Sequence, residues 1–407
     1  MRVLLFGASG HIGGAERVLL DCARVGDGFP GARVSVVTLA DGPLVAAAQD
    51  AGAHAVVVAP PARLSALGDS FASARTVLLR TLPAVAGSPA FLRRLSRALA
   101  SLAPDLIHTH GIKTHVLAAL LPSHAPLIWH VHDYIGMRPV SARLLRLLSR
   151  RCALVIAVSD SVAADARAVL PGTRVTVVHN SVDTESFRPD GPAGDLDVLA
   201  GLPPAPAGTI RIGLPATFAR WKGQETFLQA LARLDRPQVR GYVIGAPLYA
   251  TRDSQVSMEA LTALASQLGL DGRIGFTGLI TDMPSAYRAL DVVVHASTRP
   301  EPFGLVLVEA MACGRALVAV ADGGSGELFV NEQHALAATA GDPASLARAL
   351  ARLVDNAEER AAMGGRARAH VVERFGQDGF AANLRSALGA VLPLTVGADA
   401  GAHPELA

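Results

Sequence analysis

One acidic stretch in the second half of the chain has the residue types and spacing of a binding site for a phosphorylated ligand. Residues 299–314 read RPEPFGLVLVEAMACG, with prolines before Gly304 and a glycine at the end. These boundaries predict one short helix. The first amides of a helix have no partner within it and carry about half a positive charge, which favours a diphosphate. We therefore expect the backbone at Gly304, Leu305 and Val306 to bind an anion.

Two glutamates flank this helix start and add a second kind of recognition. Glu309 lies about 7.5 Å along the predicted helix, and helical side chains lean towards the N-terminus, so its carboxylate points back at the bound group. Glu301 lies in the loop that precedes the helix. A carboxylate repels phosphate oxygens but accepts hydrogen bonds from sugar hydroxyls. The pair around an anion site therefore indicates a nucleotide sugar.

A glycine-rich turn near the N-terminus is a second candidate for phosphate binding. Residues 6–20 read FGASGHIGGAERVLL and follow a short apolar run, and a strand, such a turn and a helix together bind phosphates. The GxxGxxG spacing is close to a dinucleotide-binding fingerprint. No acidic residue stands directly after the second strand to bind a ribose, which argues against a nicotinamide cofactor. The turn alone leaves open which phosphorylated ligand it holds.

Lysine is rare in this chain, which contains only Lys113 and Lys222 and otherwise uses arginine. A genomic base composition that favours arginine codons explains the overall bias. A lysine kept against such a bias is more often than average required as a compact ammonium. Both lysines are therefore candidates for ligand contacts.

These candidates need a fold that brings distant segments together, and the apolar runs indicate one. Short apolar runs alternate with helical patterns, which is typical of parallel α/β architecture. Ligands of such sheets bind at the carboxyl ends of the strands, where every candidate residue lies. The first series of runs covers residues 3–7, 33–39, 55–59, 105–110, 127–132, 154–159 and 175–180, and the second covers 210–216, 240–245, 273–278, 292–297 and 316–321.

The pattern predicts an α/β fold with two Rossmann-like, doubly wound parallel sheets facing across a cleft. The segment between the two series is rich in glycine, proline and aspartate and predicts a linker. The tail is expected to be disordered from about Val396. The expected parts are a first domain over 1–189, a linker over 190–208, a second domain over 209–375, a helix over 376–392 that returns to the first domain, and a tail over 393–407.

The composition excludes several classes of protein. The chain has 407 residues, of which 50% are hydrophobic and 18% charged, with a formal net charge of +2. This balance argues against nucleic acid as a partner, and 3 widely separated cysteines predict reduced core thiols. No apolar run reaches the ~18–20 residues of a membrane span. The short first run predicts a strand rather than a signal peptide, so we expect a cytoplasmic protein.

Several stretches, spread over nearly the whole chain, resemble the retaining glycosyltransferases of family 4, which have the GT-B fold. Glu301 and Glu309 match the E-x7-E motif of that family within EPFGLVLVEAMACG. The resemblance implies transfer of a sugar from a nucleoside-diphosphate sugar (UDP- or GDP-sugar) to an acceptor hydroxyl, with retained anomeric configuration, no bound metal and no cofactor. The other similar stretches are FARWKGQETFLQAL (218–231), HNSVDTESFRP (179–189), GGAE (13–16) and HVHD (130–133).

The resemblance assigns roles in donor binding to residues that match the family motifs. Lys222 binds the diphosphate together with the helix start at Phe303–Val306. Glu309 holds the ribose hydroxyls. The turn at Gly13 and Gly14 closes over the phosphates from the first domain, which implies that its glycines approach a diphosphate other than that of NAD.

On the sugar side, the resemblance places Glu301 beside the transferred sugar and His132 near its hydroxyls and the reacting carbon. Lys113 and His110 are the candidate contacts for the acceptor, although a structural or surface role for Lys113 is the alternative. The acceptor itself stays open, as a lipid-linked saccharide, a polysaccharide or a small natural product.

The chain departs from the family pattern at two positions. Thr217 stands where the family has an arginine, so one cation for the diphosphate is missing, and Arg220 is the candidate that replaces it. Ser181 stands in place of a glycine in the loop after Asn180. Neither change touches the E-x7-E motif.

Two patterns could indicate a metal, and for both we favour another interpretation. His108, His110 and His115 are explained better as polar residues at strand ends near the cleft. Asp195 and Asp197 mimic the metal-binding DxD motif of other glycosyltransferases, but they lie in the predicted linker and are expected to be solvated.

The role of one basic stretch stays open, as do two functions other than sugar transfer. Residues 143–151 read RLLRLLSRR and predict a packed helix with a solvated arginine face, with peripheral contact to an anionic membrane at the inner face as the alternative. A nucleotide-sugar 2-epimerase shares the fold expected here. A non-catalytic nucleotide-sugar-binding regulator is the third possibility, which Thr217 favours.

Overall fold

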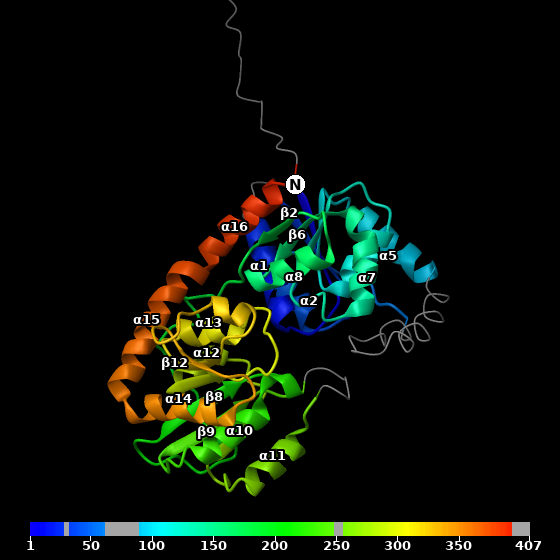
Figure 1. Cartoon of the computed structure of the whole chain (residues 1–407). Helices are drawn as coiled ribbons and strands as arrows, with labels where there is room; N and C mark the ends of the chain where they lie inside the picture. Colours follow the sequence, from blue (N-terminus) through cyan, green and yellow to red (C-terminus); the bar gives the residue numbers. More distant parts are fainter. Residues whose placement is uncertain (28–31, 62–88, 248–254, 393–407) are drawn as a thin grey trace, which may run out of the picture.

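The computed structural model describes residues 1–27, 32–61, 89–247 and 255–392, and Figure 1 shows them as two α/β domains in contact. The tail predicted over 393–407 lies outside these residues. Within the described residues, no helix combines the length and the apolar composition that a membrane-spanning segment needs.

The first domain is built on a parallel sheet with the strand order β3-β2-β1-β4-β5-β6-β7 in the described residues. The order reverses direction between β1 and β4, where ligands of open parallel sheets bind. Its elements are β1 (Arg2–Gly7), α1 (Gly14–Asp27), β2 (Arg33–Thr38), α2 (Pro43–Asp50), β3 (His54–Val57), α5 (Pro89–Ser101), β4 (Leu106–His110), α6 (Ile112–Leu120), β5 (Leu127–Val131), α7 (Pro139–Leu148), η1 (Ser149–Arg151), β6 (Cys152–Ala157), α8 (Asp160–Val169) and β7 (Val175–Val177).

The second domain repeats this plan with a smaller parallel sheet, ordered β10-β9-β8-β11-β12-β13. Its direction of winding reverses between β8 and β11. The elements are α9 (Leu196–Leu199), β8 (Ile210–Pro215), η2 (Arg220–Lys222), α10 (Gln224–Arg233), β9 (Val239–Ile244), α11 (Met258–Gln267), β10 (Ile274–Gly278), α12 (Met283–Arg288), β11 (Val292–His295), α13 (Leu305–Ala312), β12 (Ala316–Val320), η3 (Gly324–Glu327), β13 (Leu336–Ala338), α14 (Pro343–Asp355) and α15 (Ala357–Phe375).

Each apolar run identified in the sequence overlaps one of these strands, which confirms the prediction of two parallel α/β units. Strands covered by helices on both faces need apolar side chains on both faces, so they appear as continuous runs of valine, leucine and isoleucine. Strand β13 was not predicted. Its sequence is LAA, which is too short and too poor in β-branched residues to stand out.

The last helix, α16 (Gln377–Gly389), lies on the first domain although it follows the second domain in sequence. Figure 1 shows α15 and α16, in orange to red, running along one side of both domains. Phe380, Leu384 and Leu388 of α16 are buried in the same apolar cluster as residues of β1 and α1. The two segments of the chain that cross between the domains also contact each other. The Val182 amide of the first segment donates to the Phe375 carbonyl of the second at 2.9 Å.

The predicted linker is in part a structured segment that is anchored to the second sheet. Asp195 is exposed and caps α9, where its carboxylate accepts from the amides of Asp197 and Val198. Asp197, in contrast, is buried and pairs with Arg240 at 2.6 Å. The prediction that both aspartates are solvated is therefore wrong for Asp197. The sequence could not reveal this pairing because its partner lies on β9, more than forty residues away.

Asp197 is the centre of a buried polar network. Its carboxylate also accepts hydrogen bonds from the Tyr242 hydroxyl at 2.6 Å, from Arg211 at 3.2 Å and from the Ala205 amide at 3.0 Å. Burial alone would raise the pKa of Asp197, but the Tyr242 hydroxyl and the Arg240 guanidinium outweigh it and hold that pKa well below its usual range. The carboxylate stays charged and fixes the linker to strands β8 and β9.

We expect Asp197→Ala to lower the free energy of unfolding by about 3–5 kcal/mol, because Arg240 then remains buried without its counter-charge. The folded-state pKa of Asp197 is depressed, so this stabilisation is present above the ordinary aspartate value of 3.8 and is lost as the pH falls below it. Urea denaturation followed by circular dichroism at pH 7 and in acid measures both effects.

Asp195→Ala is the matched control, since it removes only an exposed cap worth about 1 kcal/mol. Equal stabilities of the two variants at pH 7 would contradict the assigned role of Asp197.

Candidate functional site

Lys222 and Glu301 form an ion pair where β8 and β11 end. The Lys222 ammonium lies 2.7 Å and 2.9 Å from the two carboxylate oxygens of Glu301. Gly223 makes this possible, because its φ is +77° and a Cβ there would lie 1.9 Å from the carbonyl oxygen of Ala296. Only glycine lets the η2 turn approach the end of β11 this closely. The turn thereby places the ammonium beside the loop that leads into α13.

The Glu301 carboxylate is nearly buried and is held by polar groups from its own loop. The Ser297 hydroxyl donates to it at 2.9 Å, and the His295 ring nitrogen lies 3.4 Å away. Burial alone would raise the pKa of Glu301, but Lys222 and His295 outweigh it and hold the pKa well below the usual range. Lys222 uses two of its three N–H donors on Glu301, which leaves one for another anion.

Helix α13 begins next to this ion pair, as the sequence predicted. Gly304 precedes it with φ 103°, a conformation that favours glycine, and Leu305 and Val306 at the first turn are partly exposed. The amides of Leu305 and Val306 have no partner within the helix and are available to an anion, whereas the Leu307 amide donates to the Gly304 carbonyl at 2.9 Å. The side chain of Phe303 is buried against Phe375, with ring centroids 6.0 Å apart. Phe303 can therefore contribute only its backbone.

Glu309 points back towards the first domain and meets an arginine there. Its carboxylate is 7% exposed and lies 2.5 Å from the guanidinium of Arg17. The Tyr287 hydroxyl donates to its second oxygen at 2.8 Å. Burial raises the pKa of Glu309, although Arg17 and Tyr287 oppose this shift. Arg17 was not predicted, because its only signal in the sequence is its position one helical turn after Gly13.

The glycine turn lies against the same helix across the domain interface. A Cβ at Gly14 would lie 3.5 Å from a methyl carbon of Leu305. The Gly13 amide donates to Glu16 at 3.1 Å, which tightens the first turn of α1. The structure therefore brings the predicted turn, α13 and Glu309 together at one place.

Two further contacts across the interface were not predicted. The Tyr134 hydroxyl, which follows β5, donates to the carbonyl of Glu301 at 3.3 Å and accepts from the amide of Gly324 at 3.2 Å. Glu327 accepts from the amides of Asp160 and Ser161 at 2.8 Å and 2.7 Å, so a carboxylate of the second domain caps α8 of the first. Both contacts join loops at the carboxyl ends of the two sheets, which therefore face one another.

His132 follows β5, and its ring contacts His110. The distance from His110 Nδ1 to His132 Nε2 is 3.0 Å. Burial lowers the pKa of His132 to about 3, so its ring is neutral near neutral pH. His110 is only 4% exposed, and the prediction that it contacts the acceptor does not fit this buried position. Lys113 is partly exposed on the first turn of α6.

Thr217 precedes the η2 turn that carries Lys222, and Arg220 is the first residue of that turn. The Thr217 carbonyl accepts from the Gln224 side chain at 2.8 Å. The Arg220 side chain is 65% exposed and lies 4.0 Å from Glu225, on its own segment. Arg220 as a replacement for the missing arginine stays a prediction.

Taken together, the site offers one ammonium and the free amides of a helix start, with a carboxylate on each side. The ammonium and the amides suit a diphosphate, and the two glutamates suit hydroxyl groups at its ends.

Comparisons with known proteins point to one family. The model described as "Glycosyltransferase Family 4" matches residues 12–186, and that described as "Glycosyl transferases group 1" matches residues 205–370. A D-inositol 3-phosphate glycosyltransferase of Mycobacterium sp. (strain JLS) is 36% identical over 154 residues, which are 37% of this chain and 33% of that protein. The chain thus aligns with about a third of the length of this curated relative.

Solved structures resemble nearly the whole chain. Anabaena Alr3699/HepE in complex with UDP and glucose has a TM-score of 0.78 and 27% identity, over 95% of this chain and 99% of that one. Sucrose-phosphate synthase from Thermosynechococcus elongatus has a TM-score of 0.74 and 21% identity, over 95% and 97% of the two chains. The second likeness concerns the fold alone.

Proposed function

The chain belongs to the family 4 glycosyltransferases and has the GT-B fold, and we propose that it transfers a sugar from a UDP-sugar to an acceptor hydroxyl with retention of the anomeric configuration. The observation that carries this proposal is the ion pair of Lys222 with Glu301 in the loop that leads into α13, the helix that also carries Glu309. Uridine is the proposed base because the Anabaena structure, at 27% identity, is a complex with UDP and glucose.

In the proposed reaction, the bond between the anomeric carbon and the diphosphate oxygen breaks, and its electron pair stays on the diphosphate. Lys222 and the α13 amides stabilise that charge in a partly desolvated site. The acceptor oxygen bonds to the anomeric carbon on the face that the diphosphate leaves, and its proton passes to a phosphate oxygen. We assign no nucleophile on the protein. Because Lys222 and the amides already supply positive charge to the diphosphate, we propose that transfer needs no metal ion there.

Glu309 and Glu301 address different parts of the donor in this proposal. Glu309 accepts hydrogen bonds from the ribose hydroxyls. Arg17 then has to share the Glu309 carboxylate with the ribose or move away from it. Glu301 and His132 contact the transferred sugar. Because burial keeps His132 neutral, its ring accepts or donates a hydrogen bond without adding charge next to the anomeric carbon. Gly13 and Gly14 close over the phosphates from the first domain.

Ligand-induced stabilisation and product analysis test the proposal. Of UDP, GDP, dTDP and ADP, we expect UDP to bind most tightly and therefore to raise the melting temperature most. A ligand at 100 times its Kd adds about 2.7 kcal/mol to the free energy of unfolding. Incubation with UDP-glucose then releases UDP, and proton NMR detects α-glucose as the first anomer formed. Release of β-glucose first would contradict retention.

Two outcomes favour the other functions. Conversion of UDP-GlcNAc alone into its 2-epimer would indicate an epimerase. UDP binding without any release of UDP from sugar donors would indicate a non-catalytic regulator.

We also propose a peripheral contact with an anionic membrane through α7. Leu145 is buried, as in an ordinary packed helix, but Leu147 is 77% exposed and Leu144 is also exposed, next to Arg143 and Arg146. Apolar and basic side chains on one surface helix suit anionic lipid headgroups.

Sedimentation with vesicles that contain phosphatidylglycerol tests the membrane contact. We expect Leu147→Asp to abolish sedimentation, and Leu279→Asp, at an exposed leucine of the second domain, to leave it unchanged. Equal sedimentation of both variants would contradict the proposal.

A further inference from the structure

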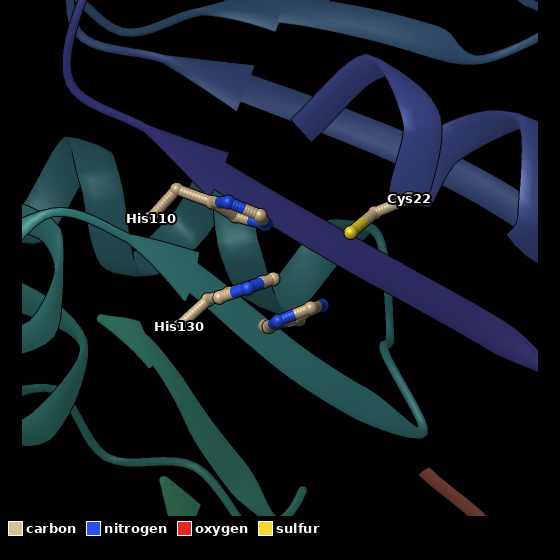
Figure 2. Close-up of side chains that lie close together, drawn as sticks. Cys22, His110 and His130 are labelled. Carbon is tan, nitrogen blue, oxygen red and sulfur yellow. The ribbon is translucent and has the colours of Figure 1, made fainter. Parts of the chain in front are cut away.

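Three histidines and one cysteine meet inside the first domain, on the face of the sheet that α1 covers. His108 and His110 alternate along β4 and therefore project from the same face. His130 on β5 is the register partner of His110. Cys22 comes from α1, and Figure 2 shows its sulfur directed towards the space beside the rings of His110 and His130. No step of the proposed transfer uses this group.

The four side chains are buried, and most ring nitrogens of the three histidines lack hydrogen-bond partners in the described residues. Cys22, His108, His110 and His130 are each at most 4% exposed. In the described residues, both ring nitrogens of His108, both of His130 and Nε2 of His110 have no hydrogen-bond partner. A buried polar group without a partner costs about 1–3 kcal/mol on folding. Five such atoms in one place indicate that something else binds them.

We propose that Cys22, His108, His110 and His130 bind one transition-metal ion, with Zn²⁺ as the best match. One ligand atom of each residue lies within 4.8 Å of all the others. In a tetrahedral zinc site, bond lengths near 2.0–2.3 Å place the ligand atoms about 3.3–3.6 Å apart, so each has to move inward by at most about 1 Å. Three imidazoles and a thiolate suit zinc, whereas Mg²⁺ and Ca²⁺ prefer oxygen ligands.

The three rings lie close together, although those of His108 and His130 are stacked with 5° between their planes, so one of them has to turn before both can direct a nitrogen at one ion. The ring centroids of His108 and His110 are 4.6 Å apart, and that of His130 lies 5.2 Å and 5.0 Å from them. When the ion binds, the Cys22 sulfur loses its proton to solvent and forms the metal–sulfur bond. For His108 and His110 the site replaces the interpretation as polar residues at strand ends, whereas His115 lies outside it and contacts the Thr109 hydroxyl at 2.6 Å.

His110 connects this site to His132. With Nε2 of His110 on the metal, its Nδ1 carries the proton and donates it in the 3.0 Å contact to Nε2 of His132. His132 is then fixed in the tautomer with its proton on Nδ1. The ion therefore acts as a positioning element behind His132, away from the donor diphosphate.

Metal analysis of the full chain, without an affinity tag, tests the site and needs no sugar donor. After chelation and reloading with Zn²⁺ alone, we expect about one ion per chain by mass spectrometry. With Co²⁺ we expect the near-ultraviolet thiolate-to-cobalt band and the visible bands of a tetrahedral site. Zinc also raises the melting temperature by mass action.

Cys22→Ala removes one ligand, and we expect it to weaken zinc binding by at least ~10-fold and to abolish the thiolate band. Cys152→Ala is the matched control, because Cys152 lies on β6 of the same domain, where its thiol contacts the Leu154 carbonyl. If Cys22→Ala does not fold, the cobalt spectrum of the unaltered chain decides. Absence of stoichiometric metal from that chain, or a cobalt spectrum without the thiolate band, overturns the proposal, whether or not sugar transfer is observed.

Discussion

Replacement of Lys222 by methionine lowers the rate of UDP release from UDP-glucose by about 10²–10³-fold, because the ammonium no longer stabilises the charge of the leaving diphosphate. Methionine keeps much of the length of the side chain and leaves Glu301 without its main partner. UDP binding weakens as well. Initial rates at saturating donor, with calorimetric titration of UDP, separate the effect on kcat from the effect on binding.

The matched control for Lys222→Met is Arg236→Met, which removes a cation from an exposed pair with Asp355. Exposed ion pairs contribute little to stability because solvent screens them, so this variant keeps its stability and its rate. A Lys222→Met protein that is folded and turns over donor within about threefold of the unaltered protein would exclude the assigned role, since a catalytic cation contributes more than that.

Glu309→Gln is expected to weaken UDP binding by about 10–100-fold. A hydrogen bond to a charged group is worth about 1.5–3 kcal/mol, and the amide offers one oxygen where the carboxylate offers two. Burial raises the pKa of Glu309, which means that its charge is not favoured by the fold. Removal of the charge therefore lowers the UDP affinity more than it lowers the free energy of unfolding. Titration of UDP measures the affinity, and a melting curve shows that the variant is folded.

The acidity of Glu309 adds a second readout. Its pKa lies above the usual 4.5, so protonation weakens UDP binding at a higher pH than an ordinary glutamate would cause. This decline in acid is absent from Glu309→Gln. Glu332→Gln is the control, because it changes an exposed carboxylate that pairs with Arg352. This variant binds UDP with the affinity of the unaltered chain. Unchanged UDP affinity in Glu309→Gln would remove Glu309 from the ribose site.

The fold was predictable because parallel strands leave a strong signal. Most buried strands are predominantly apolar runs, and twelve such runs identified twelve strands. The segment around Asp197 was misread because glycine and proline indicate a break in secondary structure but not what the break packs against. Whether a charged residue there is solvated depends on Arg240, which no local pattern connects to it.

The site was predictable only where its parts are local in sequence. Gly304, Glu301 and Glu309 lie in one stretch, and helical geometry relates them. Arg17 and Tyr134 were missed, since each contacts the other domain and nothing in its own segment indicates this. The histidines alternate visibly in HTH and HVH, but the register of β4 with β5 and the position of Cys22 on α1 come only from the folded chain.

The return of α16 means that the first domain is not one continuous piece of the sequence. A fragment that stops at residue 189 lacks Phe380, Leu384 and Leu388 and leaves the surface beneath them open to water. Met1 and Leu392 border the same apolar cluster, so a circular permutation that joins them, with new ends near Pro192, would make each domain contiguous. The permuted chain would cross between the domains once instead of twice, which frees them to rotate about a single tether.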